Sequence, residues 1–157
     1  MKVVIVAVGR VRGPLEPAVA EYEGRAGRYW KFEVAEVDAG ASGRNPSPER
    51  VKEAEGERIL ARIPDDAEVI ALTRAGKGVG SAELAKTLEA LAVRSFRQVV
   101  FVLGGAYGLH ARVLDRANRR LSLSPMTLPH EMARLVLAEQ LYRAGTIVRG
   151  EPYHKGA

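Results

Sequence analysis

Two uninterrupted apolar segments set the strongest limit on how this chain can fold. Residues 2–8 read Lys-Val-Val-Ile-Val-Ala-Val, and residues 98–103 read Gln-Val-Val-Phe-Val-Leu. A strand with one solvent-exposed face carries a polar residue at every second position, whereas a strand covered on both faces is apolar throughout. Both runs are also too short to cross a membrane as helices. They therefore predict inner strands of a parallel sheet that has helices on both faces.

The rest of the chain alternates between strand-like and helix-like segments. We expect further strands at 32–37, 68–73 and 120–124, and helices at 18–28, 48–63, 82–93, 110–118 and 130–145. This rhythm is typical of an α/β domain with a mainly parallel sheet. Ser47 and Ser81 precede the second and third helices, where serine is a favourable N-cap. The 157 residues contain no internal repeat and no long linker, so we expect a single domain over residues 1–157.

Composition narrows the functional classes. The 24 Lys and Arg residues outnumber the 19 Asp and Glu residues, and the net charge of +5 favours an anionic partner such as nucleic acid, although it also fits an ordinary soluble protein. The absence of cysteine excludes disulfides and thiol nucleophiles. The three histidines lack the spacing of a metal site, so we expect no bound metal. No small-residue cleavage site follows the first apolar run, which predicts a cytoplasmic protein.

Two glycine-rich segments suggest different roles. Gly76, Gly78 and Gly80 do not match the dinucleotide or P-loop patterns, so we expect a mobile loop there. Residues 104–108 read Gly-Gly-Ala-Tyr-Gly and follow a buried strand, at the sheet edge where α/β proteins bind ligands. A tight turn needs only one or two glycines. Three in five residues therefore favour a binding loop whose backbone a ligand can approach closely.

A second candidate binding segment precedes the last helix. Residues 122–130 read Ser-Leu-Ser-Pro-Met-Thr-Leu-Pro-His. The two prolines rigidify the segment, and its apolar side chains are unusual for a loop. Such a segment either packs inward or forms the wall of an apolar pocket. Backbone amides and carbonyls beside an apolar wall would suit a purine ring.

The last helix, at 130–145, has an unusually wide apolar face. A helix that covers one side of a sheet needs only a single apolar stripe. The additional surface could be covered by a second subunit, or the helix could be buried on several sides within one chain. The sequence leaves these two alternatives open.

Basic residues gather in two places toward the C-terminus. The first group is expected to share one helix face and its exit, either as a phosphate-binding surface or as a solvated face. Its members are Arg112, Arg116, Arg119 and Arg120. The second group surrounds Tyr153, and cations beside an aromatic ring suit phosphate contact with base stacking. Its members are Arg143, Arg149, His154 and Lys155.

Five segments together resemble one known family in their order and spacing: residues 6–9, 55–60, 104–109, 124–130 and 153–155. They are similar to those of the ribosomal RNA large subunit methyltransferase H family. That family methylates N3 of a pseudouridine in 23S ribosomal RNA and belongs to the SPOUT class. The resemblance covers nearly the whole chain. Its most specific parts are the Ser-x-Met-Thr-Leu-Pro-His segment and the Tyr-His pair near the end.

The resemblance implies an α/β SPOUT fold, a parallel sheet flanked by helices with a C-terminal trefoil knot, which local patterns alone would not suggest. It also implies a homodimer, which favours an interface on the apolar face of helix 130–145. The implied methyl donor is S-adenosylmethionine, bound in the loops of the knot without a metal. The implied cofactor-binding residues are Leu72, Gly104, Leu123, Ser124, Pro125, Met126, Thr127 and Leu128.

The implied reaction is methylation of pseudouridine 1915 in helix 69 of 23S rRNA, with recognition of the assembled 70S ribosome. We expect Arg143, Tyr153 and His154 to form the catalytic end of the site, where cations favour the anion left when N3 loses its proton. His154 is the best candidate to handle that proton, since histidine titrates near neutral pH. A phosphate contact from the tail is the alternative role. Two other functions stay open: a knotted tRNA methyltransferase, and a ribosome-binding module without catalytic activity.

Overall fold

The computed structural model describes residues 1–156 and contains the predicted alternation of strands and helices. The strands are β1 (Lys2–Val8), β2 (Lys31–Val37), β3 (Glu68–Gly78), β4 (Gln98–Leu103) and β5 (Arg119–Ser122). The helices are α1 (Glu16–Ala26), α2 (Pro48–Leu60), α3 (Ser81–Val93), α4 (Ala111–Arg116) and α5 (His130–Val148), with a short 3-10 turn, η1, at Gly13–Leu15. Within residues 1–156, none of the helices is long and apolar enough to cross a membrane.

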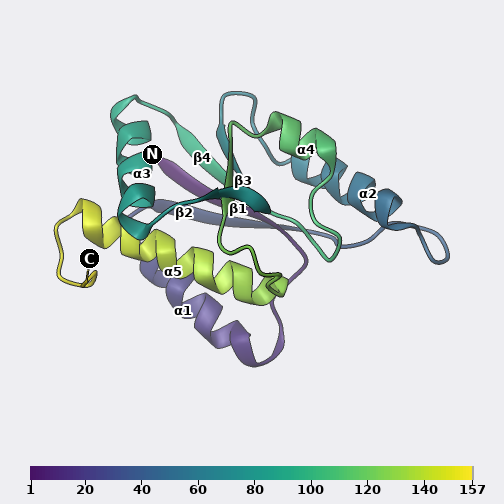
Figure 1. Ribbon diagram of the computed structural model, residues 1–157, viewed down its shortest axis with the longest axis horizontal. Helices are drawn as coiled ribbons and strands as arrows, with labels where there is room; N and C mark the ends of the chain where they lie inside the picture. The colour runs from purple at the N-terminus through teal and green to yellow at the C-terminus, as the bar shows by residue number, and fades with distance from the viewer. Residues whose placement is uncertain (157) are drawn as a thin grey trace.

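All five strands pair in parallel, in the order β2-β1-β4-β3-β5 (Figure 1). The two uninterrupted apolar runs are the inner strands β1 and β4, as the sequence predicts. Their side chains alternate between two buried layers. Val3, Ile5 and Phe101 belong to one layer, and Val4 and Val100 belong to the other.

Helices cover both faces of the sheet. α1, α3 and α5 pack together on one face, and α2 and α4 lie on the other (Figure 1). Leu137 and Leu141 of α5 are fully buried in the first layer. At Gly145 the Tyr29 ring of the neighbouring chain segment lies so close that a side chain would not fit. Trp30 donates a hydrogen bond from Nε1 to the carbonyl oxygen of Leu141 at 2.8 Å, which fixes the middle of α5 to the start of β2.

A buried arginine and two less buried carboxylates fix the first half of α5. Arg134 is 7% exposed; its Nε donates to Glu23 of α1 at 2.7 Å and its Nη1 to Glu36 of β2 at 2.8 Å. Burial lowers the pKa of Arg134, but the hydrogen bonds to the two carboxylates outweigh that effect, and the net pKa is raised. The guanidinium therefore stays charged and ties three elements together. Removal of either carboxylate would leave buried charge poorly compensated.

The mobile loop expected at Gly76, Gly78 and Gly80 is wrong, because β3 continues to Gly78. Leu121 of β5 pairs with Leu72 of β3 and again with Lys77, so the residues between these two positions form a bulge. At Gly76 the strands are in backbone contact, since a Cβ atom there would lie 2.7 Å from the backbone N and C of Leu121. Pairing with β5 thus makes a strand of a segment that has the composition of a loop.

The two serine caps have different outcomes. Ser47 caps α2 as predicted, since its Oγ accepts a hydrogen bond from the backbone N–H of Arg50 at 3.2 Å. The cap expected at Ser81 is wrong, because Gly80 is the N-cap and Ser81 is the first residue of α3. The Ser81 hydroxyl instead donates to Oε1 of Gln140 at 2.6 Å, which joins α3 to α5.

Gly76→Ala tests the close crossing of β3 and β5. The new methyl group would collide with the Leu121 backbone, and relief requires separation of the strands. We expect the free energy of unfolding, measured by urea denaturation, to fall by about 2 kcal/mol or more. Gly78→Ala is the matched control, because no heavy atom lies within 4 Å of a Cβ atom at that position of the same strand. Equal losses of unfolding free energy in the two variants would contradict the close contact of β3 with β5 at Gly76.

Candidate functional site

A cavity of about 1040 Å³ opens where β3 bulges and where β4 and β5 end. The start of α5 closes one side of it. The cavity is lined by residues 72–74, 103–109, 114, 123, 124, 126–131 and 133. Both segments that the sequence predicts as binding loops, the glycine turn after β4 and the proline-bounded loop after β5, therefore face one pocket.

The structure brings together seven of the eight predicted cofactor-binding residues around this pocket. These seven are Leu72, Gly104, Leu123, Ser124, Met126, Thr127 and Leu128. Pro125 belongs to the same loop, but it is exposed and does not line the cavity. The Ser124 hydroxyl accepts a hydrogen bond from the backbone N–H of Met126 at 3.0 Å, which shapes the loop around Pro125.

The glycine turn after β4 has no room for side chains at its first two positions. A Cβ atom on Gly104 would lie 2.8 Å from the backbone carbon of Gly108, and one on Gly105 would lie 2.9 Å from Oε1 of Glu55. Glu55 is 3% exposed and lies beneath the turn, where its Oε2 accepts a hydrogen bond from the backbone N–H of Gly40 at 2.9 Å. The turn is therefore packed from both sides, and its outer surface faces the cavity.

One polar residue of the pocket, Arg74, went unrecognised in the sequence, and a second, His130, was predicted only as the end of the candidate binding segment 122–130. Arg74 lies in the bulge of β3, and its Nη1 donates to Oγ1 of Thr127 at 2.9 Å, across the mouth of the cavity. His130 begins α5, and its Nε2 lies 3.3 Å from the carbonyl oxygen of Arg10 in the loop after β1. No local pattern marks Arg74, because the bulge that directs it to the pocket depends on pairing with β5.

Arg143, Tyr153 and His154 form a compact cluster at the other end of α5. Nη1 of Arg143 lies 3.2 Å from Nδ1 of His154, and its guanidinium carbon lies 4.7 Å from the centre of the Tyr153 ring. Glu139 organises the group, since its Oε1 accepts hydrogen bonds from Nε and Nη2 of Arg143 and from the Tyr153 hydroxyl. Glu139 lies one helical turn before Arg143, a spacing that favours such an ion pair.

The cluster keeps its phenol and guanidinium protonated. Burial and the hydrogen bond to Glu139 raise the pKa of Tyr153 to about 12. The same carboxylate raises the pKa of Arg143. Tyr153 is therefore a neutral donor and Arg143 a fixed cation over the physiological pH range. Arg149 lies apart from this cluster, because its Nη2 donates to the carbonyl oxygen of Arg28 at 3.2 Å.

The pocket and the cluster lie at opposite ends of α5 within one chain. His130 lines the pocket, and Arg143 lies thirteen positions further along the same continuous helix. At 1.5 Å per residue that distance is about 20 Å. Met132 and Val136, which lie between the two ends, are 44% and 37% exposed. A single chain therefore does not bring the predicted catalytic residues to the predicted cofactor site.

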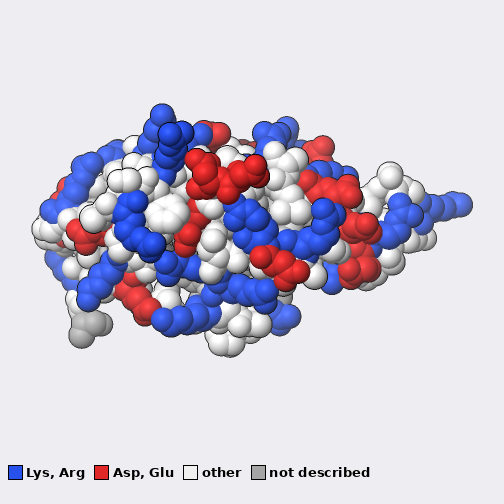
Figure 2. Space-filling view, turned by 90° about the horizontal axis from the view of Figure 1, so that it is seen from above, with Lys and Arg blue, Asp and Glu red and all other residues white. Residues whose placement is uncertain are grey.

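The arginine group expected along the helix after β4 and at its exit is divided between two elements. α4 carries Arg112 and Arg116, whereas Arg119 and Arg120, expected at the exit of the helix, lie on β5. Arg116 donates to the backbone carbonyls of residues 64, 65 and 67 at 3.1–3.2 Å, and Arg119 pairs with Glu68 at 2.9 Å. These contacts fasten α4 and β5 to the sheet. On the side shown in Figure 2, Lys and Arg lie among patches of Asp and Glu.

Within residues 1–156, His, Cys, Asp and Glu side chains form no group of three or more that could hold a metal ion. The polar groups that line the cavity come instead from backbone, from the charged residues Arg74 and Glu131, and from the side chains of Thr73, Tyr107, Ser124, Thr127 and His130. With Leu72, Leu103, Leu123 and Leu128 beside them, they form a site suited to an organic ligand with one apolar and one polar part.

Comparison with known proteins identifies the family. Residues 1–154 match a family described as predicted SPOUT methyltransferases. A protein of Gemmatimonas aurantiaca named ribosomal RNA large subunit methyltransferase H is 53% identical over 156 residues, which cover 99% of this chain and 100% of that protein. Proteins of the same name from Listeria monocytogenes and Clostridioides difficile are 47% and 45% identical over 159 residues, with the same coverage.

Among solved structures, a probable methylase family protein from Haemophilus influenzae shares the fold. The TM-score is 0.54 at 14% identity, and the match covers 98% of this chain and 70% of that one. This likeness concerns the fold alone, whereas the sequence matches extend along the whole chain. The chain therefore belongs to the SPOUT methyltransferase family, in the group formed by the ribosomal RNA large subunit methyltransferase H proteins.

Proposed function

We propose that this protein is a cytoplasmic 23S rRNA methyltransferase that modifies N3 of pseudouridine 1915 in helix 69 on the assembled 70S ribosome. The observation that carries the proposal is the full-length similarity to proteins named ribosomal RNA large subunit methyltransferase H. The cavity at the ends of β3, β4 and β5 supports it independently, because it offers a site for a nucleoside-sized ligand.

SPOUT methyltransferases use S-adenosylmethionine, and the residues of the cavity fit this molecule. Leu123 and Leu128 would cover the adenine, and the packed turn at Gly104 would let the ligand lie against backbone. Glu131 is a carboxylate available for the amino group of the methionine part. The bound cofactor supplies an activated methyl group on a sulfonium, a reaction that needs no metal.

We assign Arg143 and Tyr153 to the target base. N3 of pseudouridine must give its proton to solvent water before it can accept a methyl group, and the negative charge then spreads to the neighbouring carbonyl oxygens. A fixed guanidinium and a neutral phenol are two donors that would stabilise this charge. Both are positioned in advance by Glu139, so no reorganisation is required when the charge develops.

His154 has a defined tautomer in this arrangement. A guanidinium only donates hydrogen bonds, so Nδ1 of His154 accepts from Arg143 and the ring proton of a neutral imidazole lies on Nε2. His154 would thus act as a third donor to the base while this contact holds. To take the N3 proton it would first have to release Arg143.

We propose that the active site is completed by a second copy of the chain. The exposed side chains of Met132 and Val136 on α5 offer an apolar contact surface for a homodimer. Val136 lies two helical turns from Pro129 and two turns from Arg143. Antiparallel packing of two α5 helices about a two-fold axis near Val136 would therefore place the Arg143 cluster of one subunit beside the pocket of the other.

We also infer that the whole chain is one domain with a C-terminal trefoil knot. The pairing of Leu121 with both Leu72 and Lys77 supports this inference, because β3 contacts β5 both before and after its bulge. The knot is tested by pulling the chain at Lys2 and Arg149 in a force spectrometer. An open chain should extend by about 3.5 Å per residue, whereas a knotted chain should end up shorter by the length of several residues. An extension equal to that of an open chain would contradict the knot.

Methyl transfer from labelled S-adenosylmethionine tests the function directly. The substrates are 70S particles, 50S subunits and naked 23S rRNA from cells that lack the modification, together with unmodified tRNA. We expect label on a helix 69 pseudouridine, with the highest rate on 70S particles, because RNA is recognised largely through shape and exposed bases. Label only on tRNA, or cofactor binding without transfer to any substrate, would contradict the proposed reaction.

Mixed dimers test the composite site. Gly104→Ala damages the pocket and Arg143→Ala damages the cluster, so each homodimer should lose most of its activity. In a dimer of the two variants, one site combines an intact pocket with an intact cluster. Random pairing of equal amounts should then restore about a quarter of wild-type activity, since half of the dimers are mixed and each has one intact site.

The matched control for this experiment mixes Arg143→Ala with His154→Ala, both of which damage the cluster. This mixture should restore no activity, because every site in it lacks one cluster residue. Two affinity tags, one on each variant, show whether mixed dimers of Gly104→Ala and Arg143→Ala have formed. If they have formed and activity does not recover, each subunit works alone.

A further inference from the structure

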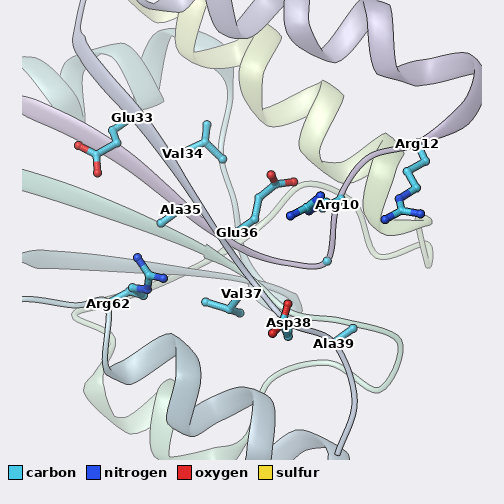
Figure 3. A pocket seen from close by; sticks show the side chains of 11 residues that line it. Arg10, Arg12, Glu33, Val34, Ala35, Glu36, Val37, Asp38, Ala39 and Arg62 are labelled. Carbon is cyan, nitrogen blue, oxygen red and sulfur yellow. The ribbon is translucent and has the colours of Figure 1, made fainter.

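A second cavity, of about 790 Å³, lies outside the site described above, along the outer edge of β2. It is lined by Gly9, Arg10, Arg12, residues 33–39 and Arg62 (Figure 3). β2 is the edge strand of the sheet, so nothing in the described part of the chain pairs with its outer side. We call this cavity the arginine groove, after the three arginines Arg10, Arg12 and Arg62, all of them exposed.

The loop after β1 presents two of these arginines on a fixed backbone. Gly9 and Gly13 both have φ of +81°, a conformation that favours glycine, and they bound the segment that carries the arginines. Between Arg10 and Arg12, Val11 is buried and anchors the segment to the core. The Gly9 N–H also donates to the carbonyl oxygen of Val37 at 2.8 Å. Both arginines are thereby turned outward from a rigid support.

The charge of the groove is mainly positive once the ion pairs are counted. Glu33 pairs with Lys2, and Glu36, which lies beside Arg10 in Figure 3, pairs with the buried Arg134. Only Asp38 remains among the acidic lining residues. In the described part of the chain, the guanidinium groups of the three groove arginines have no ion-pair partner. Three free cations beside a single carboxylate favour an anionic ligand.

The arginine groove lies next to the cofactor pocket. His130 lines the pocket, and its Nε2 lies 3.3 Å from the carbonyl oxygen of Arg10, which lines the groove. The loop from Gly9 to Arg12 therefore separates the two cavities by the thickness of one chain segment. A polyanion long enough to extend from one cavity into the other would contact this loop.

We propose that the arginine groove binds backbone phosphates of the RNA strand that flanks the target nucleotide. Guanidinium groups match the geometry of phosphate oxygens and are always charged, which suits them to this contact. The proposal rests on the proposed function, because it takes the RNA substrate as given. It assigns to Arg10, Arg12 and Arg62 the part of substrate binding that positions the strand without reading its sequence.

The test removes the two loop cations with the double substitution Arg10→Gln and Arg12→Gln. Affinity for unmodified 70S particles is measured at several salt concentrations, together with S-adenosylmethionine affinity and single-turnover methyl transfer at saturating particle concentration. We expect the affinity for the particle to fall on the order of tenfold near 0.1 M salt. The plot of log affinity against log salt has a negative slope, and we expect this slope to become shallower by about 1.4. Cofactor affinity and the single-turnover rate should be unchanged. Addition of Arg62→Gln should make the salt dependence of binding shallower still.

The matched control removes two exposed cations elsewhere, Lys86 of α3 and Arg97 before β4, each changed to Gln. This variant should keep the wild-type salt slope. The result that would overturn the groove has two parts. The wild-type protein methylates ribosomes, and the Arg10 and Arg12 double variant binds them with an unchanged salt slope. The proposed function would then stay intact. Wild-type protein that neither binds nor methylates any RNA substrate would overturn both.

Discussion

The backbone contact between β3 and β5 at Gly76 is the constraint on which the functional part of the structure depends. Because no side chain separates the strands there, β3 can pair with Leu121 twice and bulge in between. The bulge directs Thr73 and Arg74 into the cavity. The chain then leaves β5 directly into the loop that forms the opposite wall. One close crossing thus determines two walls of the pocket and the position of α5, which closes it.

Charge is used in two distinct ways around α5. In the first half of the helix, Arg134 is buried between two carboxylates and serves to hold α1 and β2 in place. In the second half, Arg143 is paired with a single carboxylate, Glu139, and its Nη1 contacts the His154 ring. The first arrangement satisfies its guanidinium within the fold, whereas the second orients a cation that can still meet a ligand. A helix of this kind can be a structural centre and carry a functional group at the same time.

Much of this fold was predictable, and the reason lies in which features are local. Continuous burial of β1 and β4 leaves an apolar run that is visible without the structure, and glycine and proline mark the two pocket loops directly. The second half of β3 was predicted wrongly, because tertiary pairing outweighs its loop-like composition. Arg74, and Glu55 under the glycine turn, were missed for the same reason: their positions depend on segments distant in sequence. A strand was predicted at 120–124, and pairing with β3 extends it back to Arg119.

The hydrogen bond between Trp30 and Leu141 has a spectroscopic consequence. Trp30 is the only tryptophan in the sequence, and its indole nitrogen is bound to a carbonyl oxygen in the C-terminal half of α5. Indole emission therefore monitors the environment of that half-helix, close to the tyrosines that pack on the tail. Changes confined to the loops of the pocket, at the far end of α5, should not alter the emission of Trp30. The protein thus contains an intrinsic fluorophore that distinguishes events at one end of its long helix from events at the other.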